Sequence, residues 1–298
     1  MTAIYFNSHI SDDQRRAELY SGELFVYTTS PATKALCDFA REMAEEAFAP
    51  HDPREAQFAL SKEEYVGILA SLKPAFIHHP KCKSLIQDIL IDLGCDSEQT
   101  CFDVPRLRTV TSDGYLTSGL GYAFAPHRDT WYSPPMCQLN WWLPIYDVVS
   151  ENSMAFHPNY WDRSVKNSSA EFNYQDWNVT GRKDAAKQIN KDTRVQSAAL
   201  EELELTPDLR ICPEPGGLLV FSAAHLHSTV ANTAGQTRLS IDFRTVHLDD
   251  LYSDVGAPNL DSECSGTTIR DYRRCSDLSH LPEEICSRYE NAATPVLP

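Results

Sequence analysis

The sequence predicts an α+β fold that is mainly β, with helices from the N-terminal part of the chain packed against a barrel or sandwich of antiparallel strands. Two observations predict this class. Residues 30–93 contain runs whose apolar residues recur at helical spacing. From about Phe102 onward, short runs rich in β-branched and aromatic residues alternate with turn residues, as in antiparallel sheets. The length of 298 residues is ample for one large core.

Three helices are expected in the N-terminal part. The first covers residues 30–50, where Ser30 can cap the helix and Pro31 suits its first turn. A short apolar run at residues 22–27 precedes it. The second helix is expected over residues 62–71, and the third from about 82 to 93, where Gly94 ends it.

The expected strands lie in the runs 106–112, 115–125, 137–148, 216–224 and 237–246. In the last run the period of two is clear. Its polar positions are Arg238, Ser240, Asp242 and Arg244, and its apolar positions are Leu239, Ile241 and Phe243. Two interpretations stay open: a surface sheet with a solvated polar face, or a barrel whose interior is a polar cavity and whose apolar outer face is covered by the helices.

No repeat, low-complexity segment or flexible linker divides the chain. We therefore expect a single domain over residues 1–298. It has a helical N-terminal part at 1–101, a strand-rich core at 102–246 and a C-terminal extension at 247–298. Residues 128–170 and 172–215 show little periodicity, so we expect much of them to be long loops, which in compact domains usually serve as lids.

Composition argues against several classes of function. A net charge of −16 repels nucleic acids and anionic lipids, so neither is an expected partner. The N-terminus lacks a signal-peptide pattern and no run is apolar enough to span a membrane, which favours a cytoplasmic protein. The nine cysteines include no C-x-x-C pair, and we expect them to be buried, reduced thiols.

A candidate metal site begins with the sequence H-x-D at His127 and Asp129, which places two ligand side chains on one face of an extended segment. A second H-x-D occurs at His247, but only His280 follows it. The first pair is followed by His225 and His227 and then by Arg238 in an R-x-S step. We therefore discount the second pair.

The HRD of residues 127–129 and the segment HSTVANTAGQTRLS at 227–240 resemble the iron(II)/2-oxoglutarate-dependent oxygenase superfamily, and within it the phytanoyl-CoA-hydroxylase-like branch. The resemblance implies a double-stranded β-helix, the jelly-roll or cupin architecture. It also implies that His127, Asp129 and His227 bind iron(II), and that Arg238, eleven residues after His227, binds the distal carboxylate of 2-oxoglutarate. The chain departs from that branch at residues 152–161.

The implied activity is hydroxylation or another oxidation of a small molecule, with succinate and CO2 as co-products. Iron(II) accepts two imidazoles and one carboxylate and keeps three positions open. The planar fork of Arg238 suits a carboxylate, and Ser240 faces the same way. Two rivals remain: a cupin-like metal enzyme, an isomerase or hydrolase, that does not use 2-oxoglutarate, and a non-catalytic jelly roll. Whether the chain forms a homodimer stays open.

Several roles have alternatives. His225 could replace His227 as ligand, and Arg244 could replace Arg238 as the clamp, since each pair shares a face. The amides of Gln138 and Asn140 and the indole of Trp142 either point into a cavity, toward co-substrate or substrate, or belong to a core strand. The aromatic residues that form either a cavity mouth or core are Trp131, Tyr132, Trp141, Trp142, Tyr160 and Trp161. His157 is expected at the surface.

Overall fold

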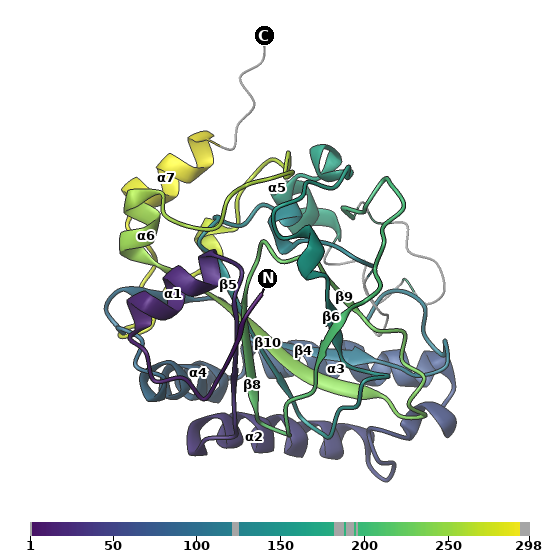
Figure 1. Ribbon diagram of the computed structural model, residues 1–298. Coiled ribbons are helices and arrows are strands. Elements are labelled where there is room, and N and C mark those ends of the chain that lie inside the picture. Colours follow the sequence, from purple (N-terminus) through teal and green to yellow (C-terminus); the bar gives the residue numbers. More distant parts are fainter. Residues whose placement is uncertain (1, 121–124, 182–187, 189–193, 195, 293–298) are drawn as a thin grey trace.

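Two β-sheets face each other in the computed structural model, and helices cover the outer face of the larger sheet (Figure 1). The structure describes residues 2–120, 125–181, 188, 194 and 196–292. The helices are α1 Asp12–Tyr20, α2 Pro31–Phe48, α3 Lys62–His78, α4 Pro80–Asp92, α5 Tyr174–Asp176, α6 Leu248–Ser253 and α7 Glu283–Ala292. The strands are β1 Ile4–Phe6, β2 Leu24–Tyr27, β3 Thr100–Phe102, β4 Arg106–Val110, β5 Leu139–Pro144, β6 Met154–Phe156, β7 Leu209–Ile211, β8 Leu218–Ser222, β9 His227–Thr229, β10 Arg238–His247 and β11 Arg273–Arg274.

The larger sheet has the strand order β1-β2-β8-β5-β10-β3-β11, and β4 also pairs with β10. Its pairs are antiparallel except for β1 with β2. The smaller sheet has the order β7-β6-β9 and is antiparallel. An isolated antiparallel bridge joins His127 to His227 at the start of β9. The first metal-motif residue is thereby attached to the edge of the smaller sheet.

The expected helix at residues 30–50 is confirmed as α2. The Ser30 hydroxyl accepts a hydrogen bond from the backbone N–H of Thr33, and Pro31 occupies the first turn. The second helix is longer than expected, because α3 continues through Pro74 to His78. Proline removes one helical hydrogen bond, but Phe76 beyond it is fully buried, and this burial favours the longer helix. The expected third helix corresponds to α4.

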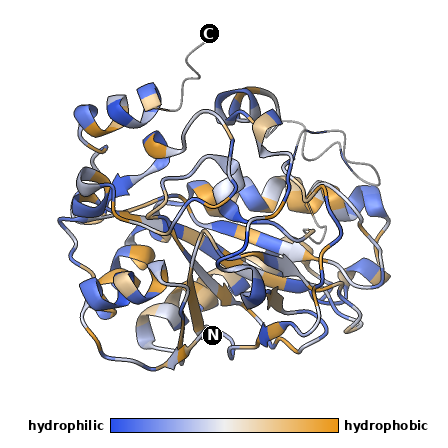
Figure 2. Cartoon of the chain, turned by 45° about the horizontal axis from the view of Figure 1, so that its top comes forward, coloured by the Kyte–Doolittle hydropathy of each residue, from blue (hydrophilic) through white to orange (hydrophobic). Residues whose placement is uncertain are grey.

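The alternation along β10 separates two environments. Its apolar positions, Leu239, Ile241 and Phe243, are buried in a core shared with α2, α3 and α4. Figure 2 shows that the covering helices have apolar residues on one side and polar residues on the other. The polar face of β10 is also largely buried, with Arg238 and Ser240 at 5% and 0% exposure. A solvated surface sheet is therefore excluded, and the polar face lines the interior.

A second apolar core lies between the sheets at one end of the sandwich. It joins Trp142 of β5 and Leu219 of β8 to Met154 and Phe156 of β6. Other residues of the larger sheet that face inward are polar, among them Asn140, Arg238 and Ser240. The interior is thus divided into an apolar region and a polar region.

The expected strand at residues 115–125 is not formed in the part that the structure describes. Residues 115–120 form no strand, and residues 121–124 of that expected strand lie outside the described residues. Much of the described part of residues 128–170 and 172–215 forms loops, as expected, apart from β5 in an expected strand run, β6, β7, α5 and short 3-10 turns. β6 and β7 span only three residues each, which is too short to show a period of two in the sequence.

The cysteines are free thiols, and seven of the nine are buried, as expected; Cys212 is exposed and Cys264 is partly buried. No described helix is long and apolar enough to cross a membrane.

Candidate metal centre

Three ligand-type side chains converge between the sheets. His127 and His227 exchange backbone hydrogen bonds of 2.9 and 3.0 Å across their bridge, which places both imidazoles side by side, with ring centroids 4.5 Å apart. Asp129 starts the 3-10 turn at Asp129–Tyr132. One of its carboxylate oxygens lies 3.3 Å from Nε2 of His127 and 3.9 Å from Nε2 of His227. The ligand atoms of all three residues lie within 4.8 Å of one another.

The backbone fixes which imidazole nitrogen faces the centre. Nδ1 of His127 lies 2.8 Å from the carbonyl oxygen of Ala125, and Nδ1 of His227 lies 2.9 Å from that of His225. Because a carbonyl only accepts, each Nδ1 donates and carries the proton in the neutral imidazole. The lone pair of each Nε2 then points toward the Asp129 carboxylate. A bound cation would satisfy these three converging acceptors.

Burial and neighbouring charges set the protonation of the group. Burial and the adjacent His127 lower the pKa of His227 to about 4, so this imidazole is neutral at pH 7. Burial alone would raise the pKa of the Asp129 carboxyl, but the charge of the neighbouring Arg244 guanidinium opposes burial and holds that pKa well below its usual value. The set therefore offers a neutral nitrogen ligand from His227 and an ionised oxygen ligand from Asp129.

His225 lies outside this group. Its ring packs 4.6 Å from the ring of Trp161 and edge-on against Phe156, and it is 1% exposed. Burial lowers the pKa of His225 to about 3. The contribution of His225 to the centre is its backbone carbonyl, which accepts the hydrogen bond from Nδ1 of His227.

Arg238 and Ser240 lie on the inner face of β10 with unused hydrogen-bonding capacity. The Arg238 guanidinium donates to the carbonyl of Asn152 at 3.1 Å and lies 5.6 Å from the ring centre of Trp142. Its Nε and the Ser240 hydroxyl have no hydrogen-bond partner among the described residues, although both are buried. Burial lowers the pKa of Arg238 to about 10, which leaves it charged at neutral pH.

Arg244 lies further along the same face, next to the candidate ligands. Its guanidinium is 3.7 Å from the Asp129 carboxylate and 3.9 Å from that of Asp103. β4 adds two more arginines, Arg106 beside Asp103 at 2.6 Å and Arg108 beside Asp242 at 3.2 Å. The β4 arginines were not among the residues expected in the site, although the alternation R-x-R at residues 106–108 places them on one face of a predicted strand.

A chain of side-chain hydrogen bonds orients the amides of Gln138, just before β5, and of Asn140 within it. The Tyr272 hydroxyl donates to Oε1 of Gln138 at 2.7 Å, and Nε2 of Gln138 donates to Oδ1 of Asn140 at 2.9 Å. Nδ2 of Asn140 is left without a partner in the described structure, and the residue is 4% exposed. Tyr272 lies in the C-terminal extension, far from the metal motifs in the sequence, and no pattern in the sequence indicated its contact with Gln138.

The aromatic residues divide between core and site. Trp131 is fully buried and donates to Asp261, Tyr160 packs with it, and Trp141 faces the helices, so these three are core residues. Tyr132 meets His127 edge-on at 5.8 Å and donates to the carbonyl of Ser197 at 2.9 Å. Trp142 reaches the interior beside Arg238.

His157 corrects a further expectation, because it is buried at 4% exposure and its Nε2 lies 3.1 Å from the Ser228 hydroxyl. The short strand β6 before it carries it into the fold, where burial lowers its pKa. Its neighbour Ser228 alternates with His227 along β9, so this contact belongs to the opposite face of the smaller sheet.

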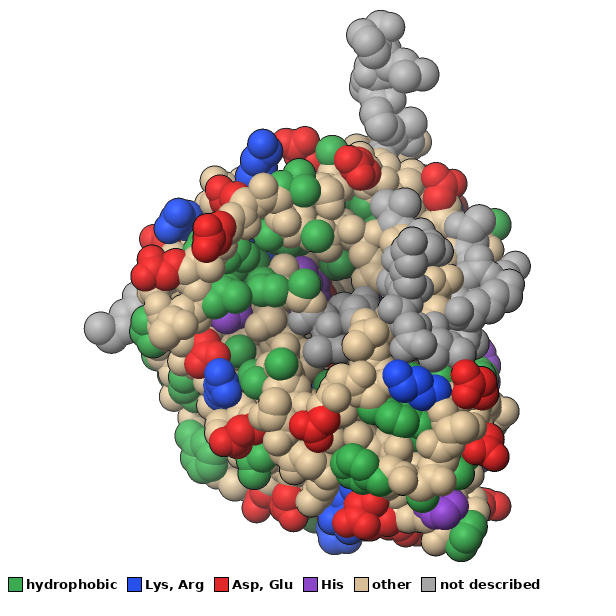
Figure 3. Space-filling model, turned by 90° about the vertical axis from the view of Figure 1, so that its right-hand side faces the viewer, with side chains coloured by type: hydrophobic (Ala, Val, Ile, Leu, Met, Phe, Trp, Pro, Cys, Tyr) green, Lys and Arg blue, Asp and Glu red, His purple; other side chains and the backbone are tan. Residues whose placement is uncertain are grey.

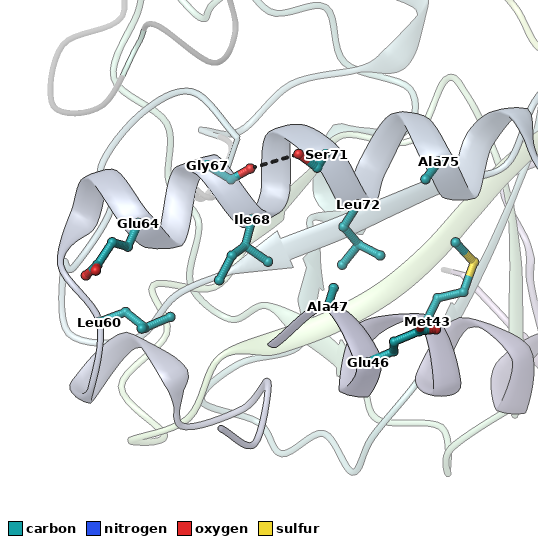
Figure 4. Close-up of a pocket in the computed structure, with 10 residues that line it drawn as sticks. All are labelled: Met43, Glu46, Ala47, Leu60, Glu64, Gly67, Ile68, Ser71, Leu72 and Ala75. Carbon is teal, nitrogen blue, oxygen red and sulfur yellow. Dashed lines mark hydrogen bonds between the residues drawn. The ribbon is translucent and has the colours of Figure 1, made fainter. Parts of the chain in front are cut away.

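Figure 3 shows one face of the molecule with a recess in which histidine side chains are visible among hydrophobic ones. A separate surface groove of about 710 Å³ runs between α2 and α3 (Figure 4). The groove is lined by Met43, Glu46, Ala47, Leu60, Glu64, Gly67, Ile68, Ser71, Leu72 and Ala75. It lies in the helical layer and contains no residue of the metal centre.

A second group of metal-ligand type side chains comprises Asp12, Asp13 and His247. Two arginines already occupy it, because Arg15 and Arg16 both pair with Asp12. Their positive charges disfavour a cation, which agrees with discounting the H-x-D at His247.

Comparisons with known proteins give structural neighbours only. No protein-family model matches the chain, and no curated protein matches it. Similar solved structures include the non-heme alpha-ketoglutarate-dependent epimerase SnoN from nogalamycin biosynthesis, at 14% identity, covering 79% of this chain and 82% of that one, with a TM-score of 0.39. EvdO2 from Micromonospora carbonacea var. aurantiaca, complexed with 2-oxoglutarate, shows 14% identity, 80% and 91% coverage and a TM-score of 0.44.

EctD from S. alaskensis, in its apoform, shows 12% identity, 80% and 78% coverage and a TM-score of 0.45. Similarities this distant assign no residue of this chain. The geometry of His127, Asp129 and His227, with the buried arginines beside them, carries the functional assignment that follows.

Proposed function

We propose that the protein is an iron(II)- and 2-oxoglutarate-dependent oxygenase that oxidises a small molecule. We place it in the phytanoyl-CoA-hydroxylase-like branch of these enzymes. The observation that carries the proposal is the convergence of Nε2 of His127, Nε2 of His227 and the Asp129 carboxylate in one buried site. Two imidazoles and one carboxylate are the donor set that suits non-haem iron(II) with open positions.

The co-substrate fits a second set of residues. 2-Oxoglutarate carries two carboxylates, and the buried Arg238 offers a planar fork with an unpartnered Nε, beside the unpartnered Ser240 hydroxyl. A buried guanidinium with an unpartnered Nε and a buried hydroxyl without a hydrogen-bond partner are costly unless a ligand completes them. We assign the distal carboxylate to Arg238 and Ser240, and the iron to the three ligands.

When bound, the iron with 2-oxoglutarate and dioxygen supplies the oxidation, which converts 2-oxoglutarate to succinate and CO2 and oxidises a substrate C–H bond. The chain contributes orientation and charge. The carbonyls of Ala125 and His225 hold both ligand imidazoles in the Nδ1–H tautomer. Arg244 keeps the Asp129 carboxylate ionised, and the apolar core around Trp142 and Phe156 excludes water from one end of the site.

The test measures binding and turnover separately. Anaerobic titration calorimetry should show that 2-oxoglutarate binds only after iron(II), and admitting dioxygen should release succinate. Asp129→Ala should weaken iron binding by about 100-fold or more. Asp249→Ala is the matched control, because this exposed aspartate belongs to the other H-x-D and should leave iron binding unchanged.

Two results would contradict the proposal. If Asp129→Ala bound iron as tightly as the wild type, the assignment of Asp129 as a metal ligand would be contradicted. Iron binding without any binding of 2-oxoglutarate would favour a cupin-like metal enzyme that acts without this co-substrate.

A further inference from the structure

We infer that Arg244 and Asn140 form a subsite for a carboxylate of the substrate, so that the protein oxidises a small organic acid. This inference rests on the proposed function and names the substrate class for the same site. The two residues are direct neighbours, because Arg244 of β10 is paired with Asn140 of β5. Opposed residues in an antiparallel pair point to the same face, with Cβ atoms about 5 Å apart.

Each residue has donors that the protein does not use. Nδ2 of Asn140 is buried and has no hydrogen-bond partner among the described residues. Its orientation is fixed, because Gln138, itself held by Tyr272, donates to its Oδ1. Among the described residues, the Arg244 guanidinium makes two ion pairs, at 3.7 and 3.9 Å, which are too long for hydrogen bonds. Its side chain is 22% exposed, so a ligand can reach it.

The charge of the site indicates a single negative group. Arg106 is paired with Asp103, and Arg108 with Asp242. Asp129 is the remaining partner of Arg244, but iron binding would engage that carboxylate. The distal carboxylate of 2-oxoglutarate is assigned to Arg238, and its other carboxylate to the iron. Arg244 is then the one inner-face arginine of the described structure that lacks its own anion.

The donor geometry favours a carboxylate over a more highly charged group. The Arg244 fork supplies parallel N–H groups and the Asn140 amide supplies one more, which matches two oxygens that share one charge. Because Arg244 lies beside Asp129, the carboxylate would be anchored close to the iron. The oxidised C–H bond should therefore lie within a few bonds of the carboxylate.

The test uses pairs of probes of nearly equal size and shape, a carboxylate and its uncharged amide. Anaerobic titration calorimetry on the full chain, loaded with iron(II) and 2-oxoglutarate, compares acetate with acetamide and phenylacetate with phenylacetamide. We expect each carboxylate to bind at least tenfold more tightly than its amide. Arg244→Gln should abolish this preference, while Arg244→Lys should keep part of it.

Asn140→Asp is the sharpest variant, because the hydrogen bond from Gln138 to Oδ1 can persist while the Nδ2 donor becomes a negatively charged oxygen. It should also abolish the carboxylate preference. Arg210→Gln removes the same charge from an exposed ion pair with Asp208 and should change nothing. Both site variants should keep a cooperative denaturant unfolding transition, which shows that they are folded.

The outcomes separate the two proposals. Equal affinity for carboxylates and amides in the wild type would overturn the inference while leaving the oxygenase assignment standing. Loss of 2-oxoglutarate binding in Arg244→Gln, with binding retained in Arg238→Gln, would overturn it too and make Arg244 the co-substrate clamp. Failure of the wild type to bind 2-oxoglutarate at all would contradict the proposed function itself.

Discussion

At the scale of single residues, His225 and His227 share a face of an extended segment but have different surroundings. His227 directs Nε2 toward Asp129, whereas His225 packs against Trp161 and Phe156. We predict that His227→Ala loses iron(II) binding by about 100-fold or more, while His225→Ala keeps it, because the backbone carbonyl that orients His227 remains. Anaerobic iron titration of both variants checks this, and the reverse pattern would move the ligand to His225.

Arg238 is the residue on which the co-substrate assignment depends. Removing a bidentate charged partner in a buried site costs about 2–5 kcal/mol, so Arg238→Gln should weaken 2-oxoglutarate binding by about 30-fold or more. Iron binding in this variant should stay near the wild-type value, because the guanidinium is not near the ligands in any described contact. An unchanged 2-oxoglutarate affinity in Arg238→Gln would refute the assignment.

At the scale of elements, β10 joins stability and function along one strand. Ile241 is fully buried toward the helices, and its neighbour Ser240 faces the interior with an unpartnered hydroxyl. Ile241→Ala should lower the free energy of unfolding by about 2–5 kcal/mol through the cavity it leaves. Ser240→Ala should instead weaken 2-oxoglutarate binding by about 3–10-fold, the equivalent of one hydrogen bond, with little change in stability.

The two variants serve as controls for each other, since they change adjacent residues on opposite faces. Denaturant unfolding and 2-oxoglutarate titration are measured on both. A loss of co-substrate affinity in Ile241→Ala equal to that in Ser240→Ala would contradict the division of the strand into a structural face and a binding face.

At the scale of the whole molecule, local sequence patterns predicted the elements whose structure depends on neighbouring residues. The period of two in β10 and the capped start of α2 were readable because each extends over enough residues to be distinctive. The smaller sheet could not be predicted from the sequence, because its strands span three residues each and are held by pairing between distant segments. The pairing of His127 with His227 joins residues one hundred positions apart, which spacing alone cannot show.

The C-terminal extension shows the same limit, because its contribution to the centre is entirely tertiary. Asp261 accepts hydrogen bonds from Arg128, Trp131 and the backbone of Val165, and thereby holds the segment that carries both His127 and Asp129. We predict that Asp261→Asn lowers the free energy of unfolding by about 3–5 kcal/mol, since Arg128 is 1% exposed and would lose its anion.

Denaturant unfolding of Asp261→Asn checks this prediction, together with iron titration, in which the affinity should fall by about 10- to 100-fold as the ligand segment loses its support. Asp208→Asn is the control, because its ion pair with Arg210 is partly exposed and should contribute about 0–1 kcal/mol. Equal effects of the two substitutions would contradict a supporting role for the extension.

The stability of the metal-free protein should also depend on pH in a defined direction. Burial lowers the pKa of His227 to about 4 and that of His225 to about 3, whereas both titrate near 6.5 when unfolded. Well above pH 6.5 both histidines are neutral in the folded and in the unfolded protein, so they do not change the free energy of unfolding. As the pH falls below 6.5, only the unfolded chain takes up the protons, so the free energy of unfolding decreases. At pH 5 the expected loss is about 2 kcal/mol per histidine.

Denaturant unfolding of the metal-free protein between pH 7.5 and 5 measures this slope. His225→Leu should reduce the loss at pH 5 by about 2 kcal/mol, because the apolar side chain takes up no proton in either state. His9→Gln should leave it unchanged, since this histidine is exposed. Iron(II) should steepen the decline, because protons compete with the metal for His227 in the folded protein and the stabilisation by the metal fades as the pH falls. A stability that is constant from pH 7.5 to 5 would show that these imidazoles are not held neutral by burial.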